Sequence, residues 1–190
     1  AWVTGSSRGI GREIAAQLAR GGARIVLHGS SAISPKIAGA GEALAVIADA
    51  MRSAHGVDVM HVCGDLSQPA VVQALVAQIH ERFGAIDILI NNAGGDIGSK
   101  GVEAPDAGKP ARNDPVFIGE DDLRAVLERN MMTCIFACRE VAPGMIARKR
   151  GRVLNIGSTA GFQPGPYMAT YYATKAFVNS LSEALAVAQR

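Results

Sequence analysis

The chain has 190 residues, 48% of them hydrophobic, and its 19 Lys and Arg are nearly balanced by 17 Asp and Glu. A chain of this length can bury roughly 70% of its extended surface, and its apolar, charge-balanced composition excludes disorder as the main state. The formal net charge of +2 is far from the clustered basic footprint of nucleic-acid binding, and no apolar run of about 20 residues is present to cross a bilayer.

The cysteines and histidines indicate neither disulfides nor a metal. The three cysteines are odd in number and form no CxxC pair, and the four histidines show no ligand spacing. Cys134 and Cys138 lie four apart in a helical pattern, where two buried small apolar residues are expected. The sequence therefore predicts a soluble cytoplasmic protein without a metal site.

Short apolar runs alternate along the chain with longer segments of helical period, a pattern typical of a parallel sheet wrapped by helices. The fold class expected is α/β, a doubly wound parallel sheet of the Rossmann type in three αβα layers. The predicted strands are Trp2–Thr4, Arg24–His28, Val57–Val62, Ile86–Asn91 and Arg152–Ile156.

The first two helices follow the first two strands. The first is predicted to begin at Gly9, to end at Gly21 and Gly22, and to turn Ile10, Ile14 and Leu18 inward. The second is predicted over about 37–54, with three large apolar residues buried: Leu44, Ile47 and Met51.

Three later helices are predicted. One begins with Ser67 as N-cap and Pro69 in its first turn, and buries Val72, Leu75, Val76 and Ile79. The others cover about 120–148, with a kink or break at Pro143, and about 170–190.

Residues 95–117 depart from this alternation. They are rich in Gly, Pro and charge and lack an apolar period, so we predict a long polar loop inserted in the domain. Such a loop is either functional or disordered, and the sequence leaves both readings open.

The run TGSSRGIG at 4–11 lies between the first strand and the first helix. Glycines there permit a tight turn and close approach of a pyrophosphate, and the helix N-terminus offers unpaired N–H groups. We expect this turn to bind a dinucleotide through Gly5, Ser7, Arg8, Gly9, Ile10 and Gly11.

The second strand ends in His28-Gly29-Ser30-Ser31, without the carboxylate that would hold the ribose hydroxyls of NAD. Ser30 and Ser31 can accept a 2′-phosphate and Arg8 can supply the countercharge, which favours NADP over NAD. Asp65 is followed by Leu66 after the third strand. Its carboxylate could accept a hydrogen bond from the adenine amino group of the cofactor or simply cap a turn.

Six features in order make the chain resemble the short-chain dehydrogenase/reductase (SDR) family. They are the turn at 4–11, Asp65, the run Asn91-Asn92-Ala93-Gly94, Asn130, Ser158, and Tyr171 followed four residues later by Lys175. The resemblance implies hydride transfer between a nicotinamide and a carbonyl or secondary alcohol.

In this reading the catalytic residues are Asn130, Ser158, Tyr171 and Lys175. Tyr171 would act as general acid and base, and Lys175, on the same helix face, would favour its phenolate form. Tyr172 is excluded because it lacks a lysine four residues on. Ser158 would hydrogen-bond the substrate oxygen, and Asn130 would hold a water in a proton relay.

The resemblance also implies further cofactor contacts from Asn91, Ala93, Gly94, Tyr171 and Lys175. Gly157 is a departure, because many members of the family carry serine there. The alternative to an enzyme is a nucleotide-binding scaffold or sensor without turnover. Within enzymes, a 3-oxoacyl reductase and a sugar or polyol dehydrogenase both remain open, and the polar loop favours a small hydroxylated substrate.

The resemblance to the family also bears on the length of the chain. Residues 1–190 are predicted to be a single NAD(P)-binding domain that is truncated at both ends and lacks the last strands of the family's sheet. Relatives pair through the helices represented here by 120–148 and 170–190, so a homodimer or homotetramer is expected.

Overall fold

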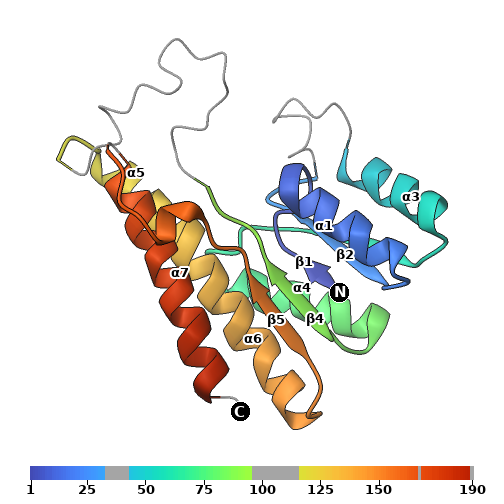
Figure 1. Cartoon of the computed structure of the whole chain (residues 1–190). Coiled ribbons are helices and arrows are strands. Elements are labelled where there is room, and N and C mark those ends of the chain that lie inside the picture. The colour runs from blue at the N-terminus through green and yellow to red at the C-terminus, as the bar shows by residue number, and fades with distance from the viewer. Residues whose placement is uncertain (33–42, 96–115, 167, 189–190) are drawn as a thin grey trace. The chain divides into compact units, whose positions relative to one another are not determined.

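A computed structural model describes residues 1–32, 43–95, 116–166 and 168–188 (Figure 1). These residues fall into two compact units, the first from 1–93 and 135–154 and the second from the described parts of 94–134 and 155–190. The elements in chain order are β1 Trp2–Val3, α1 Gly9–Arg20, β2 Ile25–Gly29, α3 Leu44–His55, β3 Val59–Cys63, α4 Pro69–Phe83, β4 Ile88–Asn91, α5 Glu120–Leu127, η3 Glu128–Met132, α6 Thr133–Ala147, β5 Arg152–Asn155, η4 Thr159–Gly161 and α7 Ala169–Ala188.

The five strands form one sheet in the order β3-β2-β1-β4-β5. β1 pairs in parallel with both β2 and β4, with Trp2 opposite Val26 on one side and Leu89 on the other, and β2 pairs in parallel with β3. Such a sheet is covered on both faces, which is why β1 and β2 are buried throughout. The predicted doubly wound α/β fold is confirmed.

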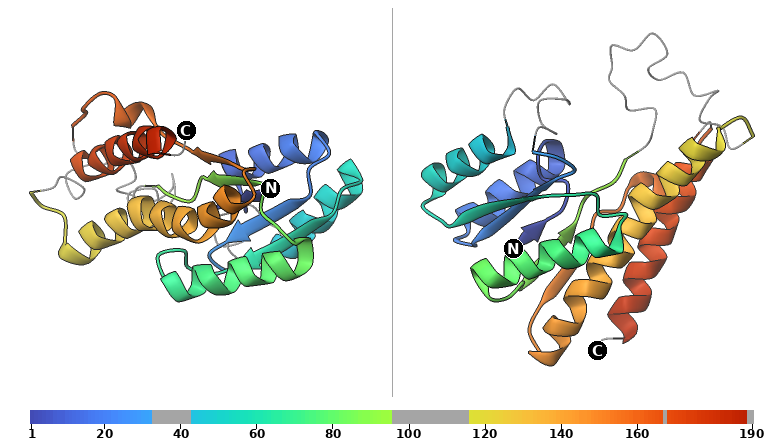
Figure 2. Two further views of the ribbon diagram at one scale, coloured as in Figure 1. Left: turned by 90° about the horizontal axis from the view of Figure 1, so that it is seen from below. Right: turned by 180° about the vertical axis from the view of Figure 1, so that it is seen from behind.

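Helices cover both faces of the sheet in the first unit. Figure 2 shows α1 and α3 on one face and α4 on the other. The predicted inward residues of α3 and α4 are all buried: Leu44, Ile47, Met51, Val72, Leu75, Val76 and Ile79. The part of the predicted second helix before residue 43 lies outside the described residues.

The prediction for the first helix is wrong at Ile10, which exposes 69% of its surface. The residues that α1 buries are instead Gly11, Ala15 and Ala19, because small side chains let the helix lie close to the strands. Ile14 is half-buried.

Two helix boundaries also differ from expectation. The N-cap of α4 is Gln68 rather than Ser67, since Pro69 at the first helical position forces the residue before it to be extended. Of the kink or break expected at Pro143, the break is absent, because α6 continues through this residue to Ala147. The irregular turn lies earlier, in the π-helical η3.

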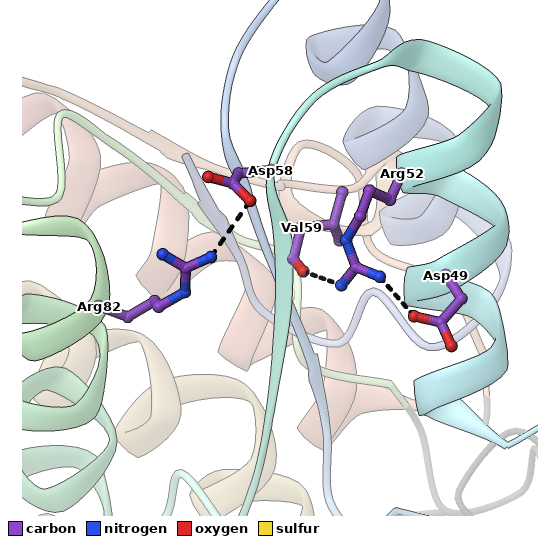
Figure 3. A network of polar contacts seen from close by, with 5 residues as sticks. All are labelled: Asp49, Arg52, Asp58, Val59 and Arg82. Atoms are coloured by element: carbon purple, nitrogen blue, oxygen red, sulfur yellow. Dashed lines mark hydrogen bonds and ion pairs between the residues drawn. The ribbon is translucent and has the colours of Figure 1, made fainter.

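Arginines from two helices contact the start of β3 (Figure 3). Arg52 of α3 donates a 2.6 Å hydrogen bond to the Val59 carbonyl and pairs with Asp49, and Arg82 of α4 pairs with Asp58 at 3.2 Å. These ion pairs are exposed, so each contributes at most about 1 kcal/mol.

Cys134 and Cys138 are both buried, as predicted. Among the residues that the structure describes, no helix combines the length and apolarity needed to span a membrane. The same residues contain no group of three or more His, Cys, Asp and Glu that could hold a metal ion. Most of the predicted loop at 95–117 lies outside the described residues.

Candidate active site

The predicted site residues divide between the two units. The glycine turn, Ser30, Ser31, Asp65, Leu66, Asn91 and Ala93 lie in the first unit, and Gly94, Asn130, Ser158, Tyr171 and Lys175 lie in the second.

The turn after β1 depends on glycine at two positions where a side chain would collide. Gly5 has a φ of +63°, and a Cβ there would stand 2.9 Å from the Ala93 Cα. A Cβ on Gly11 would stand 2.4 Å from Nδ2 of Asn92. The turn is therefore packed directly against the chain that leaves β4, as the glycine pattern predicted.

Thr4 and Asn92 hold this contact and were not predicted as site residues. Oγ1 of Thr4 donates to the Ile90 carbonyl at 3.2 Å and accepts from the N–H groups of Asn92 and Ala93, both at 2.9 Å. Nδ2 of Asn92 donates to the Thr4 and Gly5 carbonyls. Their position inside the two recognised motifs was the only sequence signal for this role.

The start of α1 fits an anionic ligand. Arg8 occupies the N-cap with an exposed side chain that makes no capping hydrogen bond, and no acidic residue lies in the first turn. A Cβ on Gly9 would meet nothing within 4 Å, so this side of the turn is open. Unpaired N–H groups and the positive end of the helix dipole favour phosphate here. Ser7, a residue of the turn itself, is buried.

The remaining residues of the first unit have clear places. Ser30 is exposed directly after β2, and Ser31 is half-buried. Asp65 is exposed, and its Oδ1 accepts from the Ser67 N–H at 2.9 Å, so it does cap a turn. Leu66 is buried, and Asn91 is buried with its Nδ2 3.1 Å from Sγ of Cys138.

In the second unit Asn130 lies inside the π-helical turn, a feature frequent at functional sites. Its Oδ1 accepts from the Gly95 N–H at 2.9 Å, and its Nδ2 donates to the Gly95 and Val126 carbonyls at 3.0 and 2.9 Å. A Cβ on Gly94 would stand 2.8 Å from that Oδ1. Asn130 therefore fixes the segment that contains Gly94.

Lys175 lies on α7 and is buried, which lowers the pKa of its ammonium, while the nearby Cys134 acts in the opposite direction. Its Nζ donates to the Ile156 carbonyl at 3.0 Å and lies 5.9 Å from the centroid of the Tyr171 ring. This places the ammonium within cation–π range of the aromatic ring. The pairing expected from the four-residue spacing is thus present.

Ser158 begins the short helix η4. It is extended, and its Oγ accepts from the Ala160 N–H at 3.2 Å, which leaves the hydroxyl proton available to another acceptor. η4 packs closely on α7, because a Cβ on Gly161 would stand 2.8 Å from the Lys175 carbonyl oxygen.

Asn179 is a third residue that sequence reasoning missed. It lies one helical turn after Lys175, and a Cβ on Gly157 would stand 2.9 Å from its Oδ1, while one on Gly161 would stand 2.5 Å from its Nδ2. The Asn179 amide thus fills the space beside Gly157, which precedes Ser158, and beside Gly161, which ends η4. The absence of serine at 157 was the available signal, but the chain gave no sign of the compensating residue.

Comparisons with known proteins identify the family of the chain. The family model described as short chain dehydrogenase matches residues 1–189. The 3beta-hydroxysteroid dehydrogenase of Mediterraneibacter gnavus is 34% identical over 97% of this chain and 58% of its own length. The very-long-chain 3-oxoacyl-CoA reductase of Mycosarcoma maydis is 33% identical over 96% of this chain and 47% of its own length.

Among solved structures, that of L-sorbose reductase from Gluconobacter frateurii, complexed with NADPH and L-sorbose, superposes with a TM-score of 0.81. It is 30% identical and the match covers 98% of this chain and 62% of that one. The fold and the two motif clusters define an α/β protein of the dinucleotide-binding class. The chain belongs to the short-chain dehydrogenase family, and it spans about three fifths of the length of the first of these relatives.

Proposed function

We propose that this protein is an NADP(H)-dependent oxidoreductase that interconverts a carbonyl compound and a secondary alcohol. The observation that carries the proposal is the pairing of Tyr171 with Lys175 on α7, whose buried ammonium lies 5.9 Å from the tyrosine ring and is held by the Ile156 carbonyl. A phenol beside a fixed positive charge is suited to give up and regain a proton.

The reduction needs one hydride and one proton. NADPH, when bound, supplies the hydride that adds to the carbonyl carbon. Tyr171 donates its phenolic proton to the carbonyl oxygen, and its phenolate regains a proton from solvent. Ser158 donates its hydroxyl proton in a hydrogen bond to the same oxygen, since the Ala160 N–H already occupies one of its acceptor sites. Lys175 stabilises the phenolate by its charge.

The cofactor is proposed from the first unit. The open N-terminal turn of α1 suits the pyrophosphate, and exposed Arg8 with Ser30 and Ser31 suits a 2′-phosphate where NAD-binding proteins carry a carboxylate. The NADPH complex of L-sorbose reductase supports the same choice.

For the substrate we propose a small hydroxylated ketone. The polar composition of residues 95–117 supports it, as does the likeness to L-sorbose reductase. If deletion of 100–113 leaves the substrate KM unchanged, the loop has no part in this choice.

One observation favours a more apolar substrate. Phe162 directly follows η4 and exposes 81% of its surface. An exposed aromatic ring on the loop begun by Ser158 would suit an acyl chain or a steroid, the substrates named in two relatives. Replacing Phe162 by Ser should weaken such a substrate and leave a sugar ketone unaffected.

The test is to follow NADPH and NADH oxidation by the full-length protein with L-sorbose, a 3-oxoacyl thioester and a 3-ketosteroid. We expect oxidation of NADPH with the sugar ketone. Binding of NADPH without turnover of any compound would instead support the scaffold or sensor. Sedimentation of the same sample tests the proposed homodimer or homotetramer.

A further inference from the structure

His28 is a polar residue near the carboxyl end of the buried strand β2. All five residues of β2 are buried, and His28 exposes only 4% of its surface. A buried imidazole is costly unless its nitrogens are hydrogen-bonded, so the partners of this ring indicate why it is tolerated.

Both ring nitrogens of His28 contact backbone. The Gly5 N–H donates to Nδ1 at 3.0 Å, and Nε2 lies 3.0 Å from the Gly64 carbonyl oxygen. An N–H can only donate and a carbonyl can only accept, so Nδ1 carries no proton and Nε2 carries one. The geometry thus defines a neutral ring in a single tautomer.

This ring joins three strands at the end that carries the ligand turn. Gly5 is the first glycine of the turn after β1, His28 lies in β2, and Gly64 directly follows β3. A second link runs beside it, because the His28 N–H donates to Oγ of Ser6 at 2.9 Å and that hydroxyl donates to the Val3 carbonyl at 2.7 Å.

Gly5 needs such a link because its conformation is unusual. Its φ is +63°, and because it lies beyond the end of β1, its N–H needs a partner outside the strand ladder. The imidazole supplies that partner. Losing it would leave a part-buried donor unsatisfied and release the turn from β2.

We propose that neutral His28 is a positioning residue of the cofactor site, which holds the phosphate-binding turn in its binding conformation through the Gly5 N–H. The inference rests on the proposed cofactor function of that turn. The bond to Gly64 has a different role, because it fixes the ring's tautomer and strengthens the sheet without contacting the turn.

Two substitutions separate the two bonds. In His28→Asn the amide oxygen can occupy the place of Nδ1 and accept from Gly5, but it cannot reach Gly64. In His28→Gln the amide nitrogen can occupy the place of Nε2 and donate to Gly64, but no acceptor remains for Gly5. Each variant loses one hydrogen bond, so similar falls in melting temperature are expected. His61, exposed on β3, provides matched controls as His61→Asn and His61→Gln.

The experiment titrates the full-length protein and its variants with NADPH and follows exchange of the Gly5 amide hydrogen. We expect the NADPH Kd to rise at least tenfold in His28→Gln with fast Gly5 exchange, and to change less than threefold in His28→Asn with slow exchange. In turnover, KM for NADPH should rise in His28→Gln while kcat at saturation is retained.

Equal affinities in the two His28 variants would overturn this inference and leave the proposed function intact, whereas failure of the wild type to bind NADPH would overturn the function itself. Should neither variant fold, nitrogen chemical shifts of the wild-type ring still decide the matter: a proton on Nδ1 contradicts the link to Gly5, and a proton on Nε2 supports it.

Discussion

Oδ1 of Asn179 lies 2.9 Å from the point at which a side chain on Gly157 would begin. The Asn179 amide on α7 therefore occupies the space that a side chain at position 157, directly before Ser158, would need. A serine at this position, which the family commonly carries, would have to displace the Asn179 amide.

Gly157→Ser should therefore disturb Ser158, the proposed hydrogen-bond donor to the substrate oxygen. Crowding of this kind costs about 1–3 kcal/mol, and we expect kcat to fall about tenfold because the Ser158 loop must shift. The double variant Gly157→Ser with Asn179→Gly should recover most of the activity. Gly119→Ser is the control, because a Cβ there meets nothing within 4 Å and serine suits the N-cap of α5. Equal losses in the single and double variants would contradict the coupling.

Tyr171→Phe should remove the proton donor while it keeps the ring beside Lys175. Loss of general acid catalysis lowers kcat by about 10²–10⁴-fold. The NADPH Kd, measured by fluorescence, should stay within about threefold because no charge is changed. Tyr172→Phe removes a hydroxyl from the adjacent residue and should retain activity. Turnover by Tyr171→Phe within a few fold of wild type would show that another group supplies the proton.

Arg8→Ala should weaken NADPH far more than NADH. The exposed guanidinium at the α1 N-cap can pair with a 2′-phosphate that NADH lacks, and a charge-assisted pair of this kind is worth about 1.5–3 kcal/mol. We expect the Kd for NADPH to rise by at least tenfold and that for NADH to change little. Arg20→Ala, at the other end of the same helix, is the control. Equal losses for the two cofactors would argue against NADP specificity.

The stability of the first unit should fall as the pH drops below neutrality. Burial lowers the pKa of His28 from its ordinary value of 6.5 to about 4, although the Gly64 carbonyl and the nearby Asp65 carboxylate oppose the shift. Below pH 6.5 the unfolded chain therefore binds a proton that the folded chain does not bind. The contribution of neutral His28 to the free energy of unfolding is complete above pH 6.5 and is lost as the pH falls toward 4. The loss amounts to roughly 3 kcal/mol.

Urea unfolding between pH 4 and pH 7.5 measures this loss. His28→Asn cannot titrate, so its free energy of unfolding should depend less steeply on pH than that of the wild type, and the difference between the two profiles isolates His28. Parallel profiles would show that the pKa of His28 is the same in the folded and the unfolded protein.

The sequence was most informative where a short pattern fixes local geometry. Alternating apolar runs predicted the sheet, and glycines at 5 and 11 predicted a turn that packs against backbone, because these features depend on neighbours a few residues apart. The proximity of Tyr171 and Lys175 could be predicted for the same reason, since a four-residue spacing defines one helix face.

What could not be predicted depends on contacts between distant residues. Ile10 fits a helical apolar period, but the helix buries alanines instead because of its closeness to the sheet. The partners of His28 are 23 and 36 residues away, and Asn179 meets Gly157 only when α7 packs on η4. Such relationships exist only in three dimensions.

The position of β3 at the end of the sheet gives the Arg52 contact a further consequence. Carbonyls alternate in direction along a strand, and Asp58 directs its oxygen to the Ile25 N–H of β2, so the Val59 oxygen faces the open side. An unpaired strand edge invites association with strands of other molecules. By occupying that oxygen, the Arg52 guanidinium removes one acceptor from the strand edge that another molecule could otherwise use.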